Sequence, residues 1–416
     1  MSKYIVTGGT PLNGRVKISG MKNAAGAVIF GCLVSGGEYT IDNVPDIGDV
    51  SVAIELLRSV GAVAEWIAPD KLRINTENVT DVRPPDELVG KIRSSYYMAG
   101  AMLARFGHVG IGMPGGCDFG SRPIDQHIKA FEQLGAVVTF GENGLAADGR
   151  LTGTEIYFDC VTVGGTMNAM LAACTADGMT VIANAAREPH VVDLANFLNT
   201  CGARISGAGT NVIKIRGVPS LHGAEYRILP DMIEAGMYMV AAAATGGCIC
   251  VESVIPKHLE AVTAKLTEMG ATVDELDDAI IVSGDKQLKA TKIKTQPYPG
   301  FPTDMQPLIA VLMSISRGTG TIQETIYDNR FRYSEELRRM GANVRVNGKS
   351  AEITGVPSLH GASVRAVDLR AGAAMIVAAL SAEGQTEIDD IYHIERGYVM
   401  PVEKFTSLGA DIRRIG

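Results

Sequence analysis

The sequence repeats one pattern six times, and this repeat limits the folds that the chain can adopt. A Gly-Ala pair follows a helix-like segment at six positions, 67 to 74 residues apart: Gly61, Gly135, Gly202, Gly270, Gly341 and Gly409. The segment before Gly270 has one apolar face, because its apolar residues Leu259, Val262, Leu266 and Met269 follow at steps of three and four. Each glycine supplies the left-handed end of a helix. We therefore predict one β/α unit used six times.

Each unit also contains strands and a second helix. Val344–Val346 and Ala351–Ile353 flank Asn347-Gly348, which predicts a β-hairpin. The second helix is apolar on every side in all six copies: Ala24–Leu33, Ser94–Ala104, Thr166–Ala173, Ile233–Ala244, Met305–Met313 and Ala371–Leu380. A helix without a polar face must be buried, and these are too short to span a membrane. Three such helices surrounded by sheets and amphipathic helices make one domain, so six units predict two.

The chain ends predict where the domains divide. A chain of 416 residues is long enough for two domains. The sixth unit stops after its amphipathic helix and first strand, so we predict that the strand-like segment Tyr4–Ser19 completes it. The first domain would then comprise residues 22–229 and the second residues 1–21 with 230–416. The chain would cross twice, near residues 20–22 and 229–231, forming a two-stranded hinge beside a cleft.

Composition and charge exclude several classes of protein. The net charge of −8 argues against a nucleic-acid groove that depends on bulk positive potential. The sequence begins MSKYIVTGGT, without a secretory signal, and has no apolar run near the ~20 residues of a membrane span, so we expect a cytoplasmic protein. Its seven cysteines form no Cys-x-x-Cys pair, which predicts reduced thiols and no metal site.

One octapeptide, Gly-Val-Pro-Ser-Leu-His-Gly-Ala, occurs at 217–224 and again at 355–362, two repeat lengths apart. We interpret it as a turn that two units share on the surface, which makes His222 and His360 structural residues.

The starts of the buried helices carry residues that do not belong in a core. They are Lys22-Asn23, Arg93-Ser94, 162–164, Asp231, Asp304 and 368–370. Helix N-termini that face one cleft favour phosphate and carboxylate groups. An aspartate at such a position is also the ordinary N-cap of a helix, so both interpretations of Asp231, Asp304 and Asp368 remain open.

Residues 114–123 contain the densest group of candidates. Three glycines in six positions, from Gly115 to Gly120, allow a loop that closes over a ligand. Within it Cys117 is either a reactive thiolate, favoured by the nearby Arg122, or an unreactive loop thiol. Two further basic groups, 327–332 and 393–397, occupy matching positions in adjacent units, which favours a shared cleft over two solvated faces.

These segments resemble the enolpyruvyl transferase family over essentially the whole chain. The resemblance rests on 19–24, 114–123, 184–189, 229–231, 301–306, 329–331, 368–370 and 396–398. It implies an inside-out α/β barrel built twice, once per domain, with three repeats each. It also implies the reaction: phosphoenolpyruvate donates its enolpyruvyl group to the 3-hydroxyl of UDP-N-acetylglucosamine through a tetrahedral ketal, and phosphate leaves. The resemblance implies no metal or organic cofactor, a place in peptidoglycan and cell-wall synthesis, and sensitivity to fosfomycin.

The resemblance also assigns roles to individual residues. The catalytic residues it implies are Cys117, Asp304 as base, Lys22 and Arg396. Cys117 is the implied proton donor, but in this family the thiol also adds covalently to phosphoenolpyruvate, so a main role in product release remains open. The phosphoenolpyruvate ligands it implies are Lys22, Asn23, Arg122, Arg330, Arg370 and Arg396. The residues it implies for the UDP-sugar are Asn23, Arg93, Arg122, Pro123, Ile124, Asp125, Gln126, Cys160, Val161, Thr162, Val163, Asp304 and Ile326. An acid and a base are needed because the methylene carbon gains a proton while the hydroxyl loses one.

Two alternatives remain open. The chain could instead act as the shikimate-pathway member of the family, which uses shikimate 3-phosphate, but the loop with Cys117 belongs to the UDP-sugar branch. It could also be a regulatory copy without activity. Lys22, Cys117, Asp304 and Arg396 are all present, which argues against that second alternative.

Overall fold

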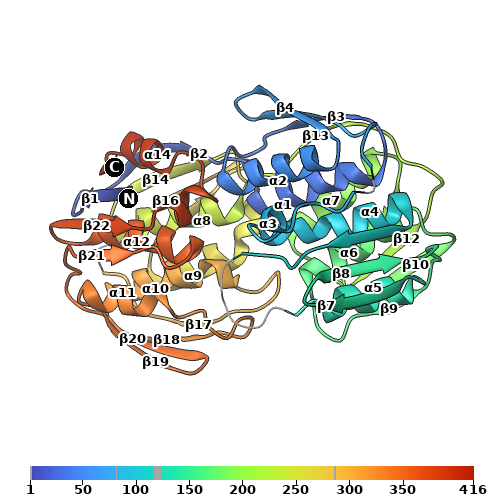
Figure 1. Ribbon diagram of the computed structural model, residues 1–416. Coiled ribbons are helices and arrows are strands. Elements are labelled where there is room, and N and C mark those ends of the chain that lie inside the picture. Colours follow the sequence, from blue (N-terminus) through green and yellow to red (C-terminus); the bar gives the residue numbers. More distant parts are fainter. Residues whose placement is uncertain (1, 81, 117–122, 285–286) are drawn as a thin grey trace. The chain divides into compact units, whose positions relative to one another are not determined.

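The computed structural model describes residues 2–80, 82–116, 123–284 and 287–416. Contacts divide these residues into two compact units (Figure 1). Of the described residues, the first unit contains 20–116 and 123–229, and the second contains those up to 19 together with those from 230 to 416. Within the described residues no helix is long and apolar enough to cross a membrane.

The first unit contains three buried helices, α1 (Lys22–Gly31), α4 (Tyr97–Phe106) and α6 (Val163–Ala173). Short 3-10 turns extend two of them: η1 (Cys32–Val34) follows α1, and η2 (Arg93–Tyr96) precedes α4. The outer helices are α2 (Gly48–Ser59), α3 (Asp86–Val89), α5 (Asp125–Gln133) and α7 (Pro189–Thr200).

Three sheets complete the first unit. Their strand orders are β13-β3-β5-β4, β6-β8-β7 and β11-β12-β10-β9. The strands are β3 (Glu38–Asp42), β4 (Val63–Ala68), β5 (Lys71–Asn75), β6 (His108–Ile111), β7 (Val137–Gly141), β8 (Gly144–Asp148), β9 (Glu155–Tyr157), β10 (Met179–Ala183), β11 (Arg204–Ser206), β12 (Val212–Arg216) and β13 (Glu225–Arg227).

The second unit has the same plan. Its buried helices are α8 (Met232–Thr245), α10 (Gln306–Ser314) and α12 (Leu369–Ser381), and the turn η4 (Thr303–Met305) leads into α10. The outer helices are α9 (Glu260–Met269), α11 (Tyr333–Arg339), α13 (Tyr392–Glu395) and α14 (Pro401–Ser407), with the turn η3 (Pro256–Leu259) before α9.

The sheets of the second unit have the orders β15-β16-β14-β2, β17-β18-β20-β19 and β21-β22-β1-β23. The strands are β1 (Lys3–Thr7), β2 (Asn13–Lys17), β14 (Cys248–Glu252), β15 (Thr272–Glu275), β16 (Ala279–Ser283), β17 (Lys292–Lys294), β18 (Thr319–Gln323), β19 (Asn343–Asn347), β20 (Ser350–Thr354), β21 (Ser363–Arg365), β22 (Gln385–Asp389) and β23 (Asp411–Ile415). Each of the two compact units therefore combines three buried helices with three sheets, which confirms the predicted fold class.

The packing and the helix ends confirm the repeat. In the second unit α8, α10 and α12 contact one another, and in the first unit α4 contacts both α1 and α6. Most residues of these helices are fully buried. All six repeat glycines have φ between +91° and +104°, a region that favours glycine because it has no Cβ. The predicted hairpin at Asn347-Gly348 is the β19–β20 pair.

The prediction that Tyr4–Ser19 completes the sixth β/α repeat is half correct. Strand β1 lies between β22 and β23, as expected. Strand β2 instead pairs in parallel with β14, in the sheet of the fourth repeat.

The pairing of the other short strands explains this difference. Three of them, β9, β17 and β21, precede a buried helix and pair in parallel with the strand that follows that helix. Strand β2 belongs to the second unit but precedes α1 of the first, and β13 belongs to the first unit but precedes α8 of the second. Each pairs within its own unit, β2 with β14 and β13 with β3. The exchange follows from the two points where the chain passes between units.

The shared octapeptide is a turn with the same hydrogen bonds in both copies, as predicted. His222 N donates to Cys201 O and His360 N donates to Met340 O, both at 2.9 Å. A Cβ at Gly202 would lie 3.2 Å from the His222 ring, and a Cβ at Gly341 would lie 3.4 Å from the His360 ring. Each histidine therefore lies against the helix-ending glycine of its repeat, which is a structural role.

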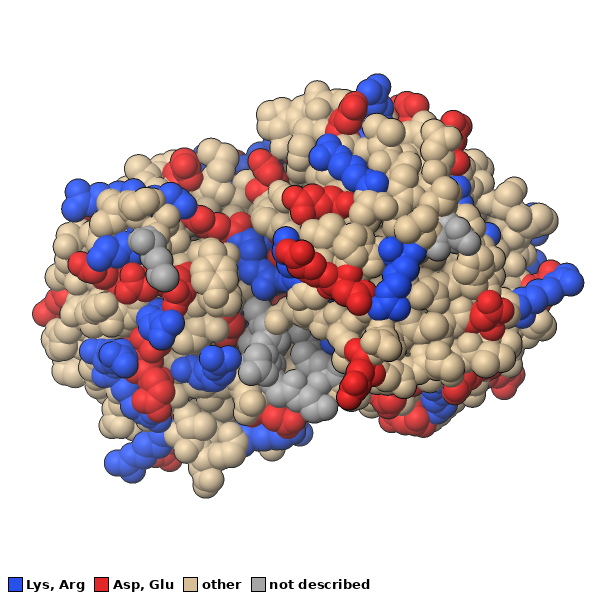
Figure 2. All heavy atoms as spheres, in the orientation of Figure 1, with Lys and Arg blue, Asp and Glu red and all other residues tan. Residues whose placement is uncertain are grey.

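Charged side chains of both signs are interspersed over the face of the molecule that Figure 2 shows. On this face an anion site would therefore need a local group of Lys and Arg residues rather than a one-sided surface charge.

Candidate active site

The starts of the buried helices in the second unit differ in what their aspartates do. Asp231 accepts hydrogen bonds from Ile233 N and Glu234 N, and Asp368 accepts them from Arg370 N and Ala371 N. Both are N-caps. Asp304 lies within η4, where Pro302 occupies the cap position, and its carboxylate contacts arginine side chains instead. Of the three aspartates, Asp304 is thus the one whose side chain is not used to cap its helix.

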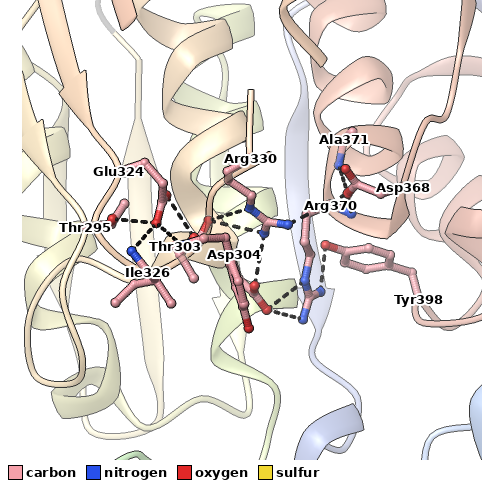
Figure 3. Close-up of polar contacts among 11 residues, drawn as sticks. Thr295, Thr303, Asp304, Glu324, Ile326, Arg330, Asp368, Arg370, Ala371 and Tyr398 are labelled. Carbon is pink, nitrogen blue, oxygen red and sulfur yellow. Dashed lines mark hydrogen bonds and ion pairs between the residues drawn. The ribbon is translucent and has the colours of Figure 1, made fainter. Parts of the chain in front are cut away.

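The Asp304 cluster consists of Asp304, Arg330, Arg370, Tyr398 and Asp368 (Figure 3). Asp304 Oδ1 lies 3.0 Å from Arg330 Nη2, while Oδ2 lies 3.0 Å from Arg370 Nε and 2.9 Å from Arg370 Nη2. Arg330 Nη1 lies 4.0 Å from Asp368 Oδ1. Both arginine side chains are buried, whereas Asp304 is 28% exposed. The carboxylate is therefore the accessible part of an otherwise buried charged group.

Local backbone contacts fix this cluster. Arg330 donates from Nε and Nη2 to Thr303 O at 3.3 and 3.2 Å, so its guanidinium is held by the residue before Asp304. The buried carboxylate of Glu324 accepts from Thr303 Oγ1 at 2.9 Å and from Ile326 N at 2.7 Å. Glu324 thereby ties the segment after β18 to the start of α10. Ile326, a predicted UDP-sugar residue, is held at this point and is 37% exposed.

Electrostatic interactions keep the cluster charged. Burial alone would lower the pKa of Arg370, but Tyr398 and Asp304 raise it more, so Arg370 stays protonated. Burial raises the pKa of the Tyr398 phenol to about 12, and Arg370 Nη1 donates a hydrogen bond of 3.0 Å to its oxygen. Two guanidinium groups beside Asp304 favour its ionised form. The cluster is a carboxylate held between two fixed cations.

The second basic group lies close to the same helix start. Arg396 ends α13, and Arg332 stands directly before α11. Burial lowers the pKa of His393, Arg396 and Arg332 lower it further by charge repulsion, and Asp368 and Asp390 act in the opposite direction. Residues of both basic segments, 327–332 and 393–397, therefore act near Asp368, and the prediction that both segments face a cleft stays a prediction.

Candidates in the first unit lie at the starts of four helices, α1, η2, α5 and α6, and those of α1 are Lys22 and Asn23. Lys22 Nζ lies 2.8 Å from Asp49 Oδ2, which joins the start of α1 to the start of α2. Asn23 is the next residue in the first turn of α1. The Lys22 ammonium is thus partly buried and paired with a carboxylate, which holds it at a defined position.

Two groups of predicted UDP-sugar residues, 123–126 and 160–163, lie at the starts of α5 and α6. Gln126 Nε2 donates to Asp159 Oδ2 at 3.1 Å, and Asp159 N donates to Gln126 Oε1 at 3.0 Å, so the start of α5 is tied to the residue before Cys160. Thr162 caps α6 by accepting from Gly165 N at 3.2 Å. Pro123 and Ile124 lead into α5, and Asp125 is its first residue. Val161 is 38% exposed and Val163 begins α6.

His127 connects this group with Arg93. Burial and then the charge of Arg93 lower the pKa of His127 to about 4, and Asp125 opposes them. A Cβ at Gly164 would lie 2.6 Å from His127 Nε2, so the ring lies directly against the first turn of α6. Arg93, the start of α5 and the start of α6 are therefore neighbours.

The predicted residues Cys117 and Arg122 lie outside the described residues. Three residues that organise the site were not predicted as part of it: Glu324, Tyr398 and Asp49. Glu324 and Asp49 contribute carboxylates from segments outside those that carry the resemblance, whereas Tyr398 contributes a phenol from the segment 396–398, which is one of them. Tyr398 directly follows the predicted Arg396-Gly397, and this adjacency was the available signal.

A cavity of about 400 Å³ lies elsewhere in the first unit. Its lining includes Leu103 and Arg105 at the end of α4 and Thr175 just after α6. Arg93 and Thr162 stand at the opposite ends of those helices, so this cavity is not where the candidate residues gather.

Among the described residues, no group of three or more His, Cys, Asp or Glu side chains is arranged to hold a metal ion.

Comparisons with known proteins identify similar chains over the full length. A family model described as EPSP synthase (3-phosphoshikimate 1-carboxyvinyltransferase) matches residues 6–405. A protein named UDP-N-acetylglucosamine 1-carboxyvinyltransferase 3 from Caldanaerobacter subterraneus subsp. tengcongensis is 53% identical, with 100% of both chains covered. A UDP-N-acetylglucosamine 1-carboxyvinyltransferase from Clostridium botulinum is 51% identical, again with 100% of both chains covered.

Solved structures show the same fold. The enolpyruvyl transferase NikO from Streptomyces tendae matches with a TM-score of 0.89 and 26% identity, over 99% of this chain and 98% of that one. An EPSP synthase from Acinetobacter baumannii matches with a TM-score of 0.76 and 18% identity, over 100% of both chains. At that identity the second match supports the fold alone.

Proposed function

Because the chain belongs to the enolpyruvyl transferase family, we propose that it transfers the enolpyruvyl group of phosphoenolpyruvate to the 3-hydroxyl of UDP-N-acetylglucosamine and releases phosphate. The observation that carries this proposal is the 53% identity, over the full length of both chains, to a relative named for that reaction. The EPSP synthase structures share only 18% and 19% identity, which makes shikimate 3-phosphate the weaker candidate acceptor. The product would enter peptidoglycan synthesis, in the cytoplasm.

Asp304 is the base in this proposal. In the addition step the sugar oxygen bonds to C2 of phosphoenolpyruvate, Asp304 takes the hydroxyl proton, and a proton is delivered to the methylene carbon C3. The result is a tetrahedral ketal. In the second step the C–O bond to phosphate breaks, C3 loses a proton, and the double bond forms again. We assign the proton donor to Cys117, which lies outside the described residues.

The pairing of Asp304 with two arginines has a consequence for its basicity. A carboxylate between two guanidinium groups is a weak base, because both favour the ionised form. Phosphoenolpyruvate is an anion, and its binding near Arg330 and Arg370 would share their positive charge. The basicity of Asp304 would then rise when the substrate is in place, so proton abstraction depends on a filled site.

The remaining candidates divide by substrate. We propose that Lys22, Asn23, Arg122, Arg330, Arg370 and Arg396 hold phosphoenolpyruvate. Arginine provides a bidentate grip on carboxylate or phosphate, and Lys22 provides a point charge. We propose that Asn23, Arg93, Arg122–Gln126, Cys160–Val163, Asp304 and Ile326 hold the UDP-sugar. The grouping of Arg93, Gln126 and Thr162 at three neighbouring helix starts supports this.

Phosphate release tests the proposed function. Purified protein with phosphoenolpyruvate should release phosphate when UDP-N-acetylglucosamine is added and should release none with shikimate 3-phosphate. A colorimetric phosphate assay with the two acceptors in parallel measures this. Release with shikimate 3-phosphate alone would reverse the assignment of the acceptor, and no release with either would exclude both.

Fosfomycin tests the role of Cys117. The epoxide should alkylate the thiolate, so we expect time-dependent inactivation of the parent protein and an increase in mass by one inhibitor molecule. Cys117→Ala should gain no mass, whereas Cys160→Ala, which removes an exposed thiol of raised pKa, should be alkylated like the parent. Equal labelling of Cys117→Ala and the parent would show that another thiol reacts.

A further inference from the structure

We propose that His393 is a further binding residue for the phosphoryl group of phosphoenolpyruvate, acting beside Arg396. This inference rests on the proposed function, and it concerns a residue outside the candidate set given above. His393 lies within the short helix α13, and Arg396 is the residue that ends it. The two are three residues apart, so their side chains share a face.

The ring of His393 has a polar atom that the fold does not satisfy. Nδ1 is buried and has no hydrogen-bond partner among the described residues. Buried polar atoms in native proteins are nearly always paired, and an exception calls for an explanation such as a ligand. The backbone of the same residue is satisfied, since His393 N donates to Asp390 O at 3.1 Å. The atom of His393 without a hydrogen-bond partner among the described residues is therefore in the ring.

The surroundings of the ring favour an anion as the missing partner. Tyr392 covers one face, with ring centroids 4.0 Å apart. The charged groups that act on the ring come from three elements: Arg396 and Asp390 flank α13, Asp368 caps α12, and Arg332 precedes α11. Asp368 already accepts from Arg370 N and Ala371 N. Asp368 is thus engaged at the start of α12 and Asp390 pairs with Arg365, whereas the positive charges of Arg396 and Arg332 both act on the ring.

The balance of charge predicts what binding does to the ring. Without a ligand, burial and then Arg396 hold the pKa of His393 below its usual value, so the ring is neutral at neutral pH. A dianionic phosphoryl group among Arg332, Arg396 and His393 favours the charged imidazolium, which raises this pKa. The ring then takes one proton from solvent and donates a hydrogen bond to a phosphoryl oxygen. Binding of a dianion should therefore strengthen as the pH falls between the pKa of the bound ring and that of the free ring.

A histidine NMR titration tests the proposal without relying on turnover. The chain has seven histidines, so each ring signal can be followed, and His393→Gln identifies the signal that disappears. Sulfate is a suitable probe because its charge does not change in this pH range. We expect sulfate to raise the pKa of the His393 signal by about one unit and to leave that of the exposed His360 unchanged. An unchanged His393 titration at saturating sulfate would overturn the proposal.

Kinetics distinguish a binding role from a structural one. His393→Gln should raise KM for phosphoenolpyruvate about tenfold, the loss of one charge-assisted hydrogen bond, with kcat nearly unchanged. The matched control His360→Gln, at an exposed ring, should leave both constants at the parent values. An unchanged KM in His393→Gln would contradict the proposal. So would a rise in KM matched by an equal fall in kcat, together with altered NMR signals from the other six histidines, because that result indicates a structural role. Absence of turnover in the parent would instead refute the proposed function and leave the sulfate titration decisive for His393.

Discussion

Asp304→Asn is expected to lower kcat by about 10²–10⁴-fold, the usual contribution of a general base. The amide keeps the shape of the side chain between Arg330 and Arg370 but cannot take the proton of the sugar hydroxyl. Binding of the UDP-sugar should be less affected than turnover, because the amide oxygen still accepts hydrogen bonds. Steady-state phosphate release, with the melting temperature measured alongside, separates loss of chemistry from loss of fold.

Asp177→Asn is the matched control for this substitution. Asp177 also pairs with an arginine, Arg150, but on the surface, where the two side chains are 62% and 86% exposed. The control should retain the kcat of the parent. If Asp304→Asn retained more than a tenth of the parental kcat, Asp304 would not be the base.

Arg330→Met is expected to lower the free energy of unfolding of the second unit by about 3–5 kcal/mol, the cost of removing one partner from a buried ion pair. The Arg330 side chain is fully buried, and its guanidinium contacts both Thr303 O and Asp304. Methionine fills part of the space but leaves the Thr303 carbonyl without its donor and removes one cation from Asp304. A urea unfolding curve, monitored by far-ultraviolet circular dichroism, measures the change in the free energy of unfolding.

Arg150→Met provides the comparison for a surface ion pair. Its pair with Asp177 is exposed, so this substitution should change the free energy of unfolding by no more than about 1 kcal/mol. Similar values for the two variants would show that the Asp304 cluster does not stabilise the second unit.

The repeat was predictable because its cause is local. Two features of the repeat depend on short segments alone: a left-handed glycine after an amphipathic helix, and a helix without a polar face. Gly270 therefore predicts the end of α9, and Ala371–Leu380 predicts the buried helix α12, without reference to the rest of the chain. The placement of β2 was not predictable in this way. Its partner β14 lies more than 230 residues away in the sequence, and only the exchange of strands at the crossings determines the pairing.

The candidate site also combines features that local sequence predicts with features that depend on distant residues. The charged helix starts were visible in the sequence, but which aspartate caps its helix was not. Asp304 pairs with Arg370, 66 residues away, while Asp368 uses the same kind of position to cap α12. The contribution of Glu324 depends on Thr303 and Ile326, which meet only in the folded unit. Side chains that organise a site through such distant partners carry no motif.

The six repeats share a scaffold but not a chemistry. The same structural position, the start of a buried helix, carries Lys22 in one repeat, a capping Asp368 in another and the accessible carboxylate of Asp304 in a third. We infer that the function arose by divergence at this position, because the helix start presents side chains without disturbing the packed helix behind it.

The structure of the product tests the central claim most directly. The protein should be incubated with phosphoenolpyruvate and UDP-N-acetylglucosamine, and the nucleotide product analysed by mass spectrometry and proton–carbon NMR. We expect a UDP-sugar that carries one enolpyruvyl ether on the 3-oxygen, with one phosphate released per product molecule and almost no product formed by Asp304→Asn. Recovery of unmodified UDP-N-acetylglucosamine, or attachment at another oxygen, would contradict it.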